Sequence, residues 1–428
     1  MARLRRGDLP PRILHPPPGP VSRRLSRQLD RYEAPGINTL GSTGSSIVWQ
    51  EARGSNVLDV DGNRYLDLTS GFGVAAVGHR HPKVVTAVRN QAGDLIHGLA
   101  DVHAHPLRLE LARRLARLAP VNNAQVFFAV SGSDAIEVAL KTALLSTGRS
   151  GVLAFEPAYH GLSLGALQVT SRPHFRYPFA AHFHSNIYRL PYGCPSPEID
   201  NQLRSHPDTA CVIVEPVVGR EGVLVPPAGW LRDLRQACTE HGVLLIADEI
   251  FTGCGRTGYW FAVENETVKP DLLCCGKALA GGLPIAAVVG RRSLFAAWEC
   301  QGEALHTGTF VAHPVSCAAA LATLDIIKSE RLPRRAARLG RMVGKRLRTW
   351  PRRSAAVLSV RGRGLLWAVE LSDRTAAHRL TDTLAGQGVL ALAGGPEGRV
   401  VQLVPPLVIT ESLLWRALDI VESSLGEI

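Results

Sequence analysis

The sequence has no apolar run long enough to cross a lipid bilayer, and it contains only six lysines among 428 residues. A membrane-spanning helix needs about 20 consecutive apolar residues, so we exclude an integral membrane protein. The N-terminal segment has no apolar core of the kind found in secretory signals. These two absences predict a cytoplasmic protein with no membrane partner.

Paired cysteine motifs are also missing. The eight cysteines are scattered without a C-x-x-C pair, and Cys274 and Cys275 are adjacent. Adjacent cysteines suit neither a zinc site nor a disulfide framework. We therefore expect no metal and reduced thiols, as in an intracellular compartment.

The net charge of +11 is densest in the N-terminal arm. A basic arm can bind nucleic acid, a membrane surface or an acidic partner. No interleaved aromatic residues or nucleic-acid motif accompany this charge, so we predict no nucleic-acid partner. We interpret residues 1–35 as a basic, Pro-rich and partly disordered arm.

Because lysine is scarce, Lys277 stands out. It lies in P-D-L-L-C-C-G-K-A-L-A-G-G-L-P-I-A-A, whereas the other five lysines lie in polar or helix-like surroundings. Burying an ammonium group is costly, so a lysine in apolar surroundings tends to become neutral. A neutral amine is a nucleophile that forms Schiff bases. The alternative is a side chain that extends to the surface.

The pattern of apolar residues predicts an α/β fold. Residues 46–68 alternate around a tight turn at 61–63, as in a β-hairpin. From about residue 82, predicted helices alternate with continuous apolar runs, which indicates a mostly parallel sheet covered by helices on both faces. We expect strands at 125–130, 152–155, 211–214, 243–247, 272–274 and 285–289, and helices at 84–90, 107–118, 134–145 and 230–241.

Four regions follow from this pattern. Residues 1–35 form the arm, 36–80 the N-terminal segment of a small domain, 81–320 a large domain, and 321–428 the C-terminal part of a smaller α+β domain.

The segment S-G-S-D-A-I-E-V-A-L-K follows a predicted strand and opens a predicted helix. It places Ser131, Gly132 and Ser133 at the helix N-terminus, where unpaired N–H groups and the helix dipole favour a phosphate. The alternative is an ordinary helix cap with Asp134 in the first turn.

Two further segments end predicted strands. In V-L-L-I-A-D-E-I, a buried strand ends at Asp248 and Glu249, and ligands of open α/β sheets bind beyond such ends. A carboxylate there can keep a pyridine nitrogen protonated. The alternative, an acidic metal site, lacks suitably spaced His or Cys ligands. In A-Y-H-G, Tyr159 offers a face for stacking beside His160, although a core tyrosine would show the same pattern.

Together these motifs resemble the class III (subgroup II, ω-amino-acid) aminotransferases, which are fold type I pyridoxal-phosphate enzymes. The resemblance runs from about Gly36 to the C-terminus. It includes V-L-D-V-D-G-N-R-Y-L-D-L, G-H-R-H-P-K-V, V-E-P, A-D-E-I-x-T-G-x-G-R-T-G, H-T-G-T-F and P-P-L-V-I-T, in the order and spacing of the family.

The resemblance implies that Lys277 holds pyridoxal 5'-phosphate (PLP) as a Schiff base and then moves a proton at the substrate carbon. It pairs Asp248 with the ring nitrogen and stacks Tyr159 on the ring. It assigns the phosphate to the residues that begin the predicted helix. The other implied cofactor contacts are His160, Glu215 and Ile250.

The resemblance also implies an active site at a subunit interface. In the family, a threonine of the neighbouring subunit completes the phosphate site, and it corresponds to Thr309 here. A homodimer is therefore expected.

Three departures from the family pattern concern the substrate, for which Phe72, Arg220 and Gln402 are the candidate contacts. Phe251 stands where a glutamine is common. Arg220 stands at a glutamate that often pairs with an arginine near the C-terminus, and Gln402 stands at that arginine. Glutamine lacks the charged, bidentate fork that holds a carboxylate.

Two hypotheses follow. In the first, Arg220 takes over carboxylate binding. In the second, the usual carboxylate site is lost and the substrate is an amine, an amino sugar or a similar carbonyl compound. The missing arginine favours the second hypothesis.

The function implied by the resemblance is ping-pong transamination between small-molecule amines and carbonyl compounds. A PLP-dependent lyase acting on a phosphorylated amine, or an aminomutase or racemase, would use the same cofactor motifs and stays an alternative.

Overall fold

A computed structural model describes residues 3–37, 46–99, 101–299 and 301–428. The chain forms two compact units. Unit 1 comprises Met1–His81, Lys345–Val360 and Ala368–Ile428, and unit 2 comprises Pro82–Gly344 and Arg361–Trp367. Within the described ranges, no helix is long and apolar enough to cross a membrane.

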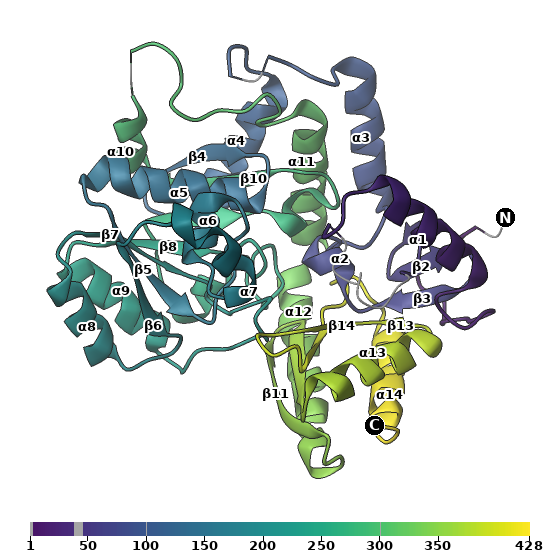
Figure 1. Ribbon diagram of the computed structural model, residues 1–428. Helices are drawn as coiled ribbons and strands as arrows, with labels where there is room; N and C mark the ends of the chain where they lie inside the picture. Colours follow the sequence, from purple (N-terminus) through teal and green to yellow (C-terminus); the bar gives the residue numbers. More distant parts are fainter. Residues whose placement is uncertain (1–2, 38–45, 100, 300) are drawn as a thin grey trace. The chain divides into compact units, whose positions relative to one another are not determined.

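Unit 2 is built on a seven-stranded sheet (Figure 1). The strand order is β4 (Ala124–Ala129), β10 (Ala286–Arg291), β9 (Leu272–Cys275), β8 (Leu244–Asp248), β7 (Thr209–Val214), β5 (Gly151–Glu156) and β6 (Ile187–Pro191). β10 runs antiparallel to both of its neighbours, and the other pairings are parallel. The mostly parallel sheet predicted from the sequence is confirmed.

The continuous apolar runs of these strands reflect burial on both faces. Alternate residues of a strand point to opposite faces, and the neighbours Val212 and Ile213 are both fully buried. On one face, α5 (Gly132–Thr147) packs against the central strands through residues such as Ile136 and Ala139. α9 (Trp230–Glu240) packs against β8.

The remaining helices of unit 2 are α3 (Pro82–Asp94), α4 (Pro106–Leu118), α6 (Leu164–Val169), α7 (Pro173–Arg176), α8 (Ser196–Ser205), α10 (Arg292–Phe295), α11 (Pro314–Ser329) and α12 (Leu332–Leu347), of which residues 345–347 belong to unit 1. Short 3-10 helices are η2 (Tyr177–His182), η3 (Ala262–Glu266), η4 (Lys277–Ala280) and η5 (Ala296–Trp298).

Unit 1 contains two four-stranded sheets. The first orders β1 (Trp49–Arg53), β2 (Asn56–Asp59), β3 (Arg64–Asp67) and β13 (Val389–Leu390). Here the predicted hairpin proves to be a three-stranded antiparallel meander. The predicted tight turn at 61–63 joins β2 to β3.

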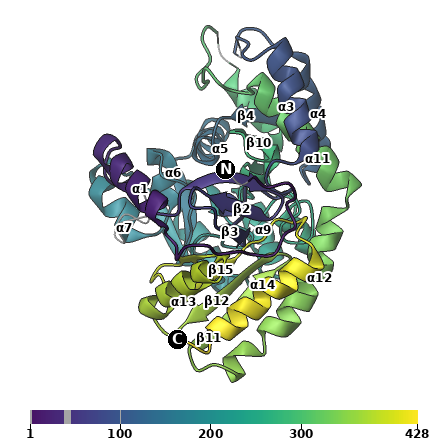
Figure 2. The same cartoon turned by 90° about the vertical axis from the view of Figure 1, so that its right-hand side faces the viewer.

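The second sheet orders β11 (Val357–Arg363), β12 (Leu366–Leu371), β15 (Val400–Leu403) and β14 (Leu392–Gly394), although residues 361–367 cluster with unit 2. Its helices α13 (Arg374–Gly386) and α14 (Glu411–Ser424) lie beside these strands (Figure 2). Unit 1 also contains α2 (Ser70–Gly73) and the 3-10 helix η6 (Trp350–Arg352).

The N-terminal arm is folded over its described residues, which corrects the prediction of partial disorder. Its helix α1 (Pro20–Tyr32) begins where the N–H groups of Val21 and Ser22 donate to the Asp61 carboxylate, at 2.7 and 2.9 Å. Ile13 packs on the apolar cluster of β2, β3 and β13. These contacts lie about 40 residues away in sequence, so the local composition did not reveal them.

The unit boundaries differ in part from the predicted domains. The first break follows His81, one residue after the boundary placed at 80. The second follows Gly344 rather than residue 320, because α11 packs against α3 and α4 of unit 2.

Candidate active site

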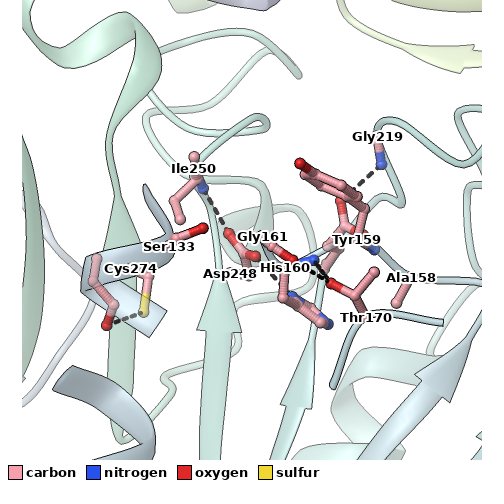
Figure 3. A network of polar contacts seen from close by, with 12 residues as sticks. Ser133, Ala158, Tyr159, His160, Gly161, Thr170, Gly219, Asp248, Ile250 and Cys274 are labelled. Carbon is pink, nitrogen blue, oxygen red and sulfur yellow. Dashed lines mark hydrogen bonds and ion pairs between the residues drawn. The ribbon is translucent and has the colours of Figure 1, made fainter. Parts of the chain in front are cut away.

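Five of the predicted site segments follow strands of the unit 2 sheet. Ser131–Ser133 follow β4, Tyr159 and His160 follow β5, and Glu215 follows β7. Asp248 ends β8, and Lys277 comes two residues after β9. These strands point in one direction, so their carboxyl ends bring the segments to one edge of the sheet, the usual ligand site of such folds. Figure 3 shows part of this group.

The Asp248 carboxylate is held from two sides (Figure 3). Its Oδ2 lies 2.8 Å from Nδ1 of the fully buried His160 side chain, and its Oδ1 accepts the N–H of Ile250 at 3.1 Å. The backbone N–H of His160 in turn donates to the Thr170 hydroxyl at 2.9 Å. The carboxylate therefore has a fixed orientation at the end of its strand.

His160 also contains an unsatisfied buried atom. Its Nε2 has no hydrogen-bond partner within the described ranges of the chain. Because burying an unpaired polar atom is unfavourable, His160 in this position lowers the stability of the folded protein.

Glu215 connects two loops of the site. Its Oε1 accepts the N–H of Tyr159 and its Oε2 accepts the N–H of Gly219, both at 2.9 Å. The pKa of Glu215 is raised to about 7, chiefly by burial; the charge of His160 and the two backbone N–H groups oppose the rise, and the charge of Asp248 contributes to it. Its side chain therefore positions the backbone on either side of the site.

Lys277 begins the 3-10 helix η4 with a φ of 37°, a conformation that is strained for a lysine. Its Nζ lies 5.1 Å from the centroid of the Phe251 ring. Burial lowers the pKa of Lys277, Asp248 and Glu215 oppose this shift, and the charge of Arg220 adds to it. A lowered pKa increases the share of the neutral, nucleophilic amine.

The N-terminus of α5 is closely surrounded by small residues. Ser131 caps the helix by accepting the N–H of Asp134 at 3.2 Å. The Ser133 hydroxyl accepts the N–H of Leu162 at 3.1 Å. A Cβ on Gly161 would lie 2.0 Å from this hydroxyl oxygen, and a Cβ on Gly132 would lie 3.1 Å from the Ile250 side chain. At position 161 only glycine permits this close approach, whereas at position 132 a larger residue would require Ile250 to move slightly.

The Tyr159 ring contacts the side chain of Arg220. The guanidinium carbon lies 4.5 Å from the Tyr159 centroid and 5.2 Å from the Phe175 centroid. Burial raises the pKa of Tyr159, and the charge and hydrogen bond of Arg220 oppose that rise.

Thr309 lies in an exposed turn of unit 2. The preceding His306 places this segment beside α5, because its Nε2 lies 3.0 Å from the Asp134 carboxylate and its Nδ1 lies 3.1 Å from Nζ of Lys141.

Phe72 and Gln402 belong to unit 1. Phe72 has a φ of 59° and is 52% exposed. Gln402 lies on β15 opposite Leu392. Arg399, three residues before Gln402, is paired with Glu370 at 2.9 Å and Glu397 at 3.3 Å, so it does not replace the missing arginine.

Sequence reasoning missed the residues that support the site from behind. Thr170 and Phe175 follow the end of the Y-H-G motif by 9 and 14 positions but form no motif themselves. Only folding brings them against His160 and Tyr159. Arg172 was missed for the same reason, although it forms a partly buried ion pair with Glu221.

The sequence profile described as Aminotransferase class-III matches residues 40–425. The chain belongs to this family. Acetylornithine aminotransferase of Methanopyrus kandleri is 41% identical over 91% of this chain and 96% of its own length. A probable 4-aminobutyrate aminotransferase of Bacillus subtilis is 34% identical over 92% and 96% of the two chains.

The structure is similar to that of the PLP-binding ornithine aminotransferase of Toxoplasma gondii. The TM-score is 0.87 at 29% identity, covering 94% of both chains. This class III aminotransferase is therefore a PLP-dependent enzyme that catalyses transamination, and it has the fold type I architecture. The predicted family, cofactor and reaction are confirmed, and the lyase and isomerase alternatives are not favoured.

The residues of unit 2 fit this cofactor. PLP has an aldehyde, a ring nitrogen and a phosphate. The edge of the sheet carries an amine with a lowered pKa, an oriented carboxylate and a helix N-terminus lined by small residues.

Proposed function

We propose that Lys277 is the residue through which this aminotransferase binds PLP covalently. The observation that carries the proposal is the position of Lys277, two residues after β9, and of Asp248, at the end of the neighbouring strand β8, at the same edge of the sheet. Once the substrate amine has displaced it, the Lys277 amine is free to act as the base that moves a proton at the substrate carbon. Its lowered pKa supports this role.

We further propose that the surrounding side chains orient the cofactor ring. PLP supplies an electron-withdrawing ring that stabilises negative charge on the substrate carbon. Asp248 would hold a proton on the ring nitrogen, with His160 keeping the carboxylate in place. Tyr159 would stack on the ring, and Ile250 would pack beside Gly132 under it.

Ser131, Gly132 and Ser133 would bind the phosphate through the N-terminus of α5. Glu215 would act by positioning the Tyr159 backbone rather than by touching the substrate.

We also propose a homodimer in which Thr309 reaches the phosphate site of the partner subunit. The exposed side chain of Thr309 supports this arrangement. A group of exposed apolar side chains also supports it. They lie on two segments that meet where His97 contacts Phe310, and they are Leu95, Ile96, Leu99, Val102, Leu305 and Phe310. Exposed apolar patches mark interaction surfaces.

The substrates are small molecules. The names of the two relatives denote substrates that carry both an amine and a carboxylate. We propose that the amino donor of this enzyme does so too, which revises the sequence-based preference for an amine, an amino sugar or a similar carbonyl compound. We place the enzyme in the cytoplasm, which the free, buried state of the seven described cysteines supports.

Borohydride reduction of the PLP-loaded enzyme, followed by peptide mapping, tests the covalent site. We expect the pyridoxyl label at Lys277 and its loss in Lys277→Ala, while the control Lys269→Ala keeps the label. A label at any other lysine would refute the assignment.

The same enzyme tests the reaction type. Without an amino acceptor, an aminotransferase converts its cofactor to the amine form in a single half-reaction, as followed by absorption. A lyase or isomerase would instead regenerate the starting absorption.

A further inference from the structure

The loop that carries Arg220 has a fixed backbone. Val218 and Leu224 close it with two backbone hydrogen bonds of 2.9 and 3.1 Å. Gly219 donates to Glu215, and a Cβ at Gly219 would lie 2.0 Å from Cδ1 of Phe251. Contacts on both sides therefore fix the backbone of Arg220, and a binding residue requires such a fixed backbone.

The Arg220 side chain lies over two aromatic rings. Its guanidinium carbon lies 4.5 Å from the Tyr159 centroid and 5.2 Å from the Phe175 centroid. The planes of these two rings are 70° apart, so the guanidinium group lies in the angle between them. Cation–π attraction to the two rings holds the group in this place.

A second arginine and a carboxylate lie near Arg220. Glu221, the next residue in the chain, is 1% exposed and accepts three hydrogen bonds of 2.8 to 3.1 Å from Arg172. The Glu221 carboxylate is therefore held by Arg172. The Arg220 charge is close enough to Lys277 to lower its pKa.

Phe251 contacts both Lys277 and the loop that carries Arg220. Its ring packs against Gly219, which precedes Arg220, and its centroid lies 5.1 Å from Nζ of Lys277. An apolar surface therefore lies beside the reacting amine and next to the Arg220 loop. Such a surface suits a donor with several methylene groups between its two polar ends.

We propose that Arg220 binds the carboxylate of an ω-amino acid donor while the distal amine of that donor reaches Lys277. The inference rests on the proposed function of Lys277 and extends it to the substrate. It assigns carboxylate binding to a residue of unit 2. The two departures Phe251 and Arg220 then form one substrate surface, with Phe251 contacting the methylene chain.

The first test compares two donors of equal chain length, 4-aminobutyrate and butylamine, in single half-reactions. Arg220→Gln should raise the KM for 4-aminobutyrate roughly 10- to 100-fold more than it raises the KM for butylamine, the loss expected for a hydrogen bond to a charged group. Arg204→Gln, which removes the same charge from an exposed position on α8, should change neither.

Two results of this test would overturn the inference. Arg220→Gln could keep the wild-type preference for 4-aminobutyrate, which would show that another group binds the carboxylate. Alternatively, it could slow both donors equally, which would show that Arg220 only holds Tyr159 in place.

The second test does not depend on turnover. Butanoate, which has the carboxylate but no amine, is titrated into the PLP-loaded enzyme by calorimetry. Its Kd should rise roughly 10- to 100-fold in Arg220→Gln and not in Arg204→Gln. Equal binding to wild type and Arg220→Gln, or no binding to wild type, would refute the role of Arg220. Should butanoate binding depend on Arg220 while no donor reacts, the proposed role of Lys277 fails instead.

Discussion

Replacing Gly161 by alanine tests the close contact between the Y-H-G loop and the start of α5. Gly161 has a φ of 128°, and a new Cβ would lie 2.0 Å from Oγ, 2.9 Å from Cβ and 3.1 Å from Cα of Ser133. Rotating the Ser133 hydroxyl away removes only the first contact. The backbone strain costs about 1–3 kcal/mol for a non-glycine residue, and losing the hydrogen bond from Leu162 costs about 1 kcal/mol.

The expected destabilisation of Gly161→Ala is therefore about 2–4 kcal/mol. Gly148 is the matched control, because it also has a positive φ (68°) but no atom within 4 Å of its Cβ position. Gly148→Ala should cost only about 1–2 kcal/mol, from backbone strain alone. The free energy of unfolding is measured by urea denaturation of the cofactor-free proteins, and the Kd of PLP by titration.

A double-mutant cycle separates strain from overlap. Adding Ser133→Gly removes the side chain that the new methyl group at position 161 would meet, so the two changes should be coupled by about 1 kcal/mol or more. The PLP affinity should fall in Gly161→Ala, because Ser133 can no longer keep its place at the phosphate site. The reasoning would be refuted if Gly161→Ala were no more destabilising than Gly148→Ala, or if the cycle showed additivity.

Two further predictions concern a buried acid and the subunit interface. Burial raises the pKa of Glu249 from its ordinary value of 4.5 to about 7, so the folded protein binds a proton more tightly than the unfolded chain, and stability should fall as pH rises from 4.5 to 7. The glutamine of Glu249→Gln can still form hydrogen bonds with Thr252 and Val263. Its free energy of unfolding should therefore match that of wild type near pH 4.5 and exceed it by about 3 kcal/mol above pH 7. A difference that stays constant with pH, measured by urea denaturation, would contradict this. For the interface, mixing the inactive Lys277→Ala with a weakly active Thr309→Asp should restore activity, since one site of the mixed dimer has both native residues. No gain over the separate variants would argue against a shared site.

Several features of the fold were predictable because they leave local patterns. Continuous apolar runs alternating with amphipathic helices indicate strands buried on both faces, and this placed five site segments at the ends of strands. The reversed direction of β10 was not predictable, because an apolar run such as Ile285–Val289 carries no information on direction. The folded state of the N-terminal arm was likewise not predictable. The composition of the arm shows its charge and proline content, but it does not show that the distant Asp61 carboxylate accepts its N–H groups.

The sequence by itself determined the family, the cofactor and the choice of Lys277 and Asp248. Their motifs depend on residue type and local spacing, and the chain presents both directly. The tertiary structure decided how the site is supported: Glu215 meets Tyr159 across 56 positions, and Asp248 meets His160 across 88. It also decided the place of Arg220. In the sequence this residue is only an arginine where the family often has a glutamate, whereas in the fold it lies over the Tyr159 ring near Lys277. Contacts of this range arise from packing around a common sheet edge, which no local pattern encodes.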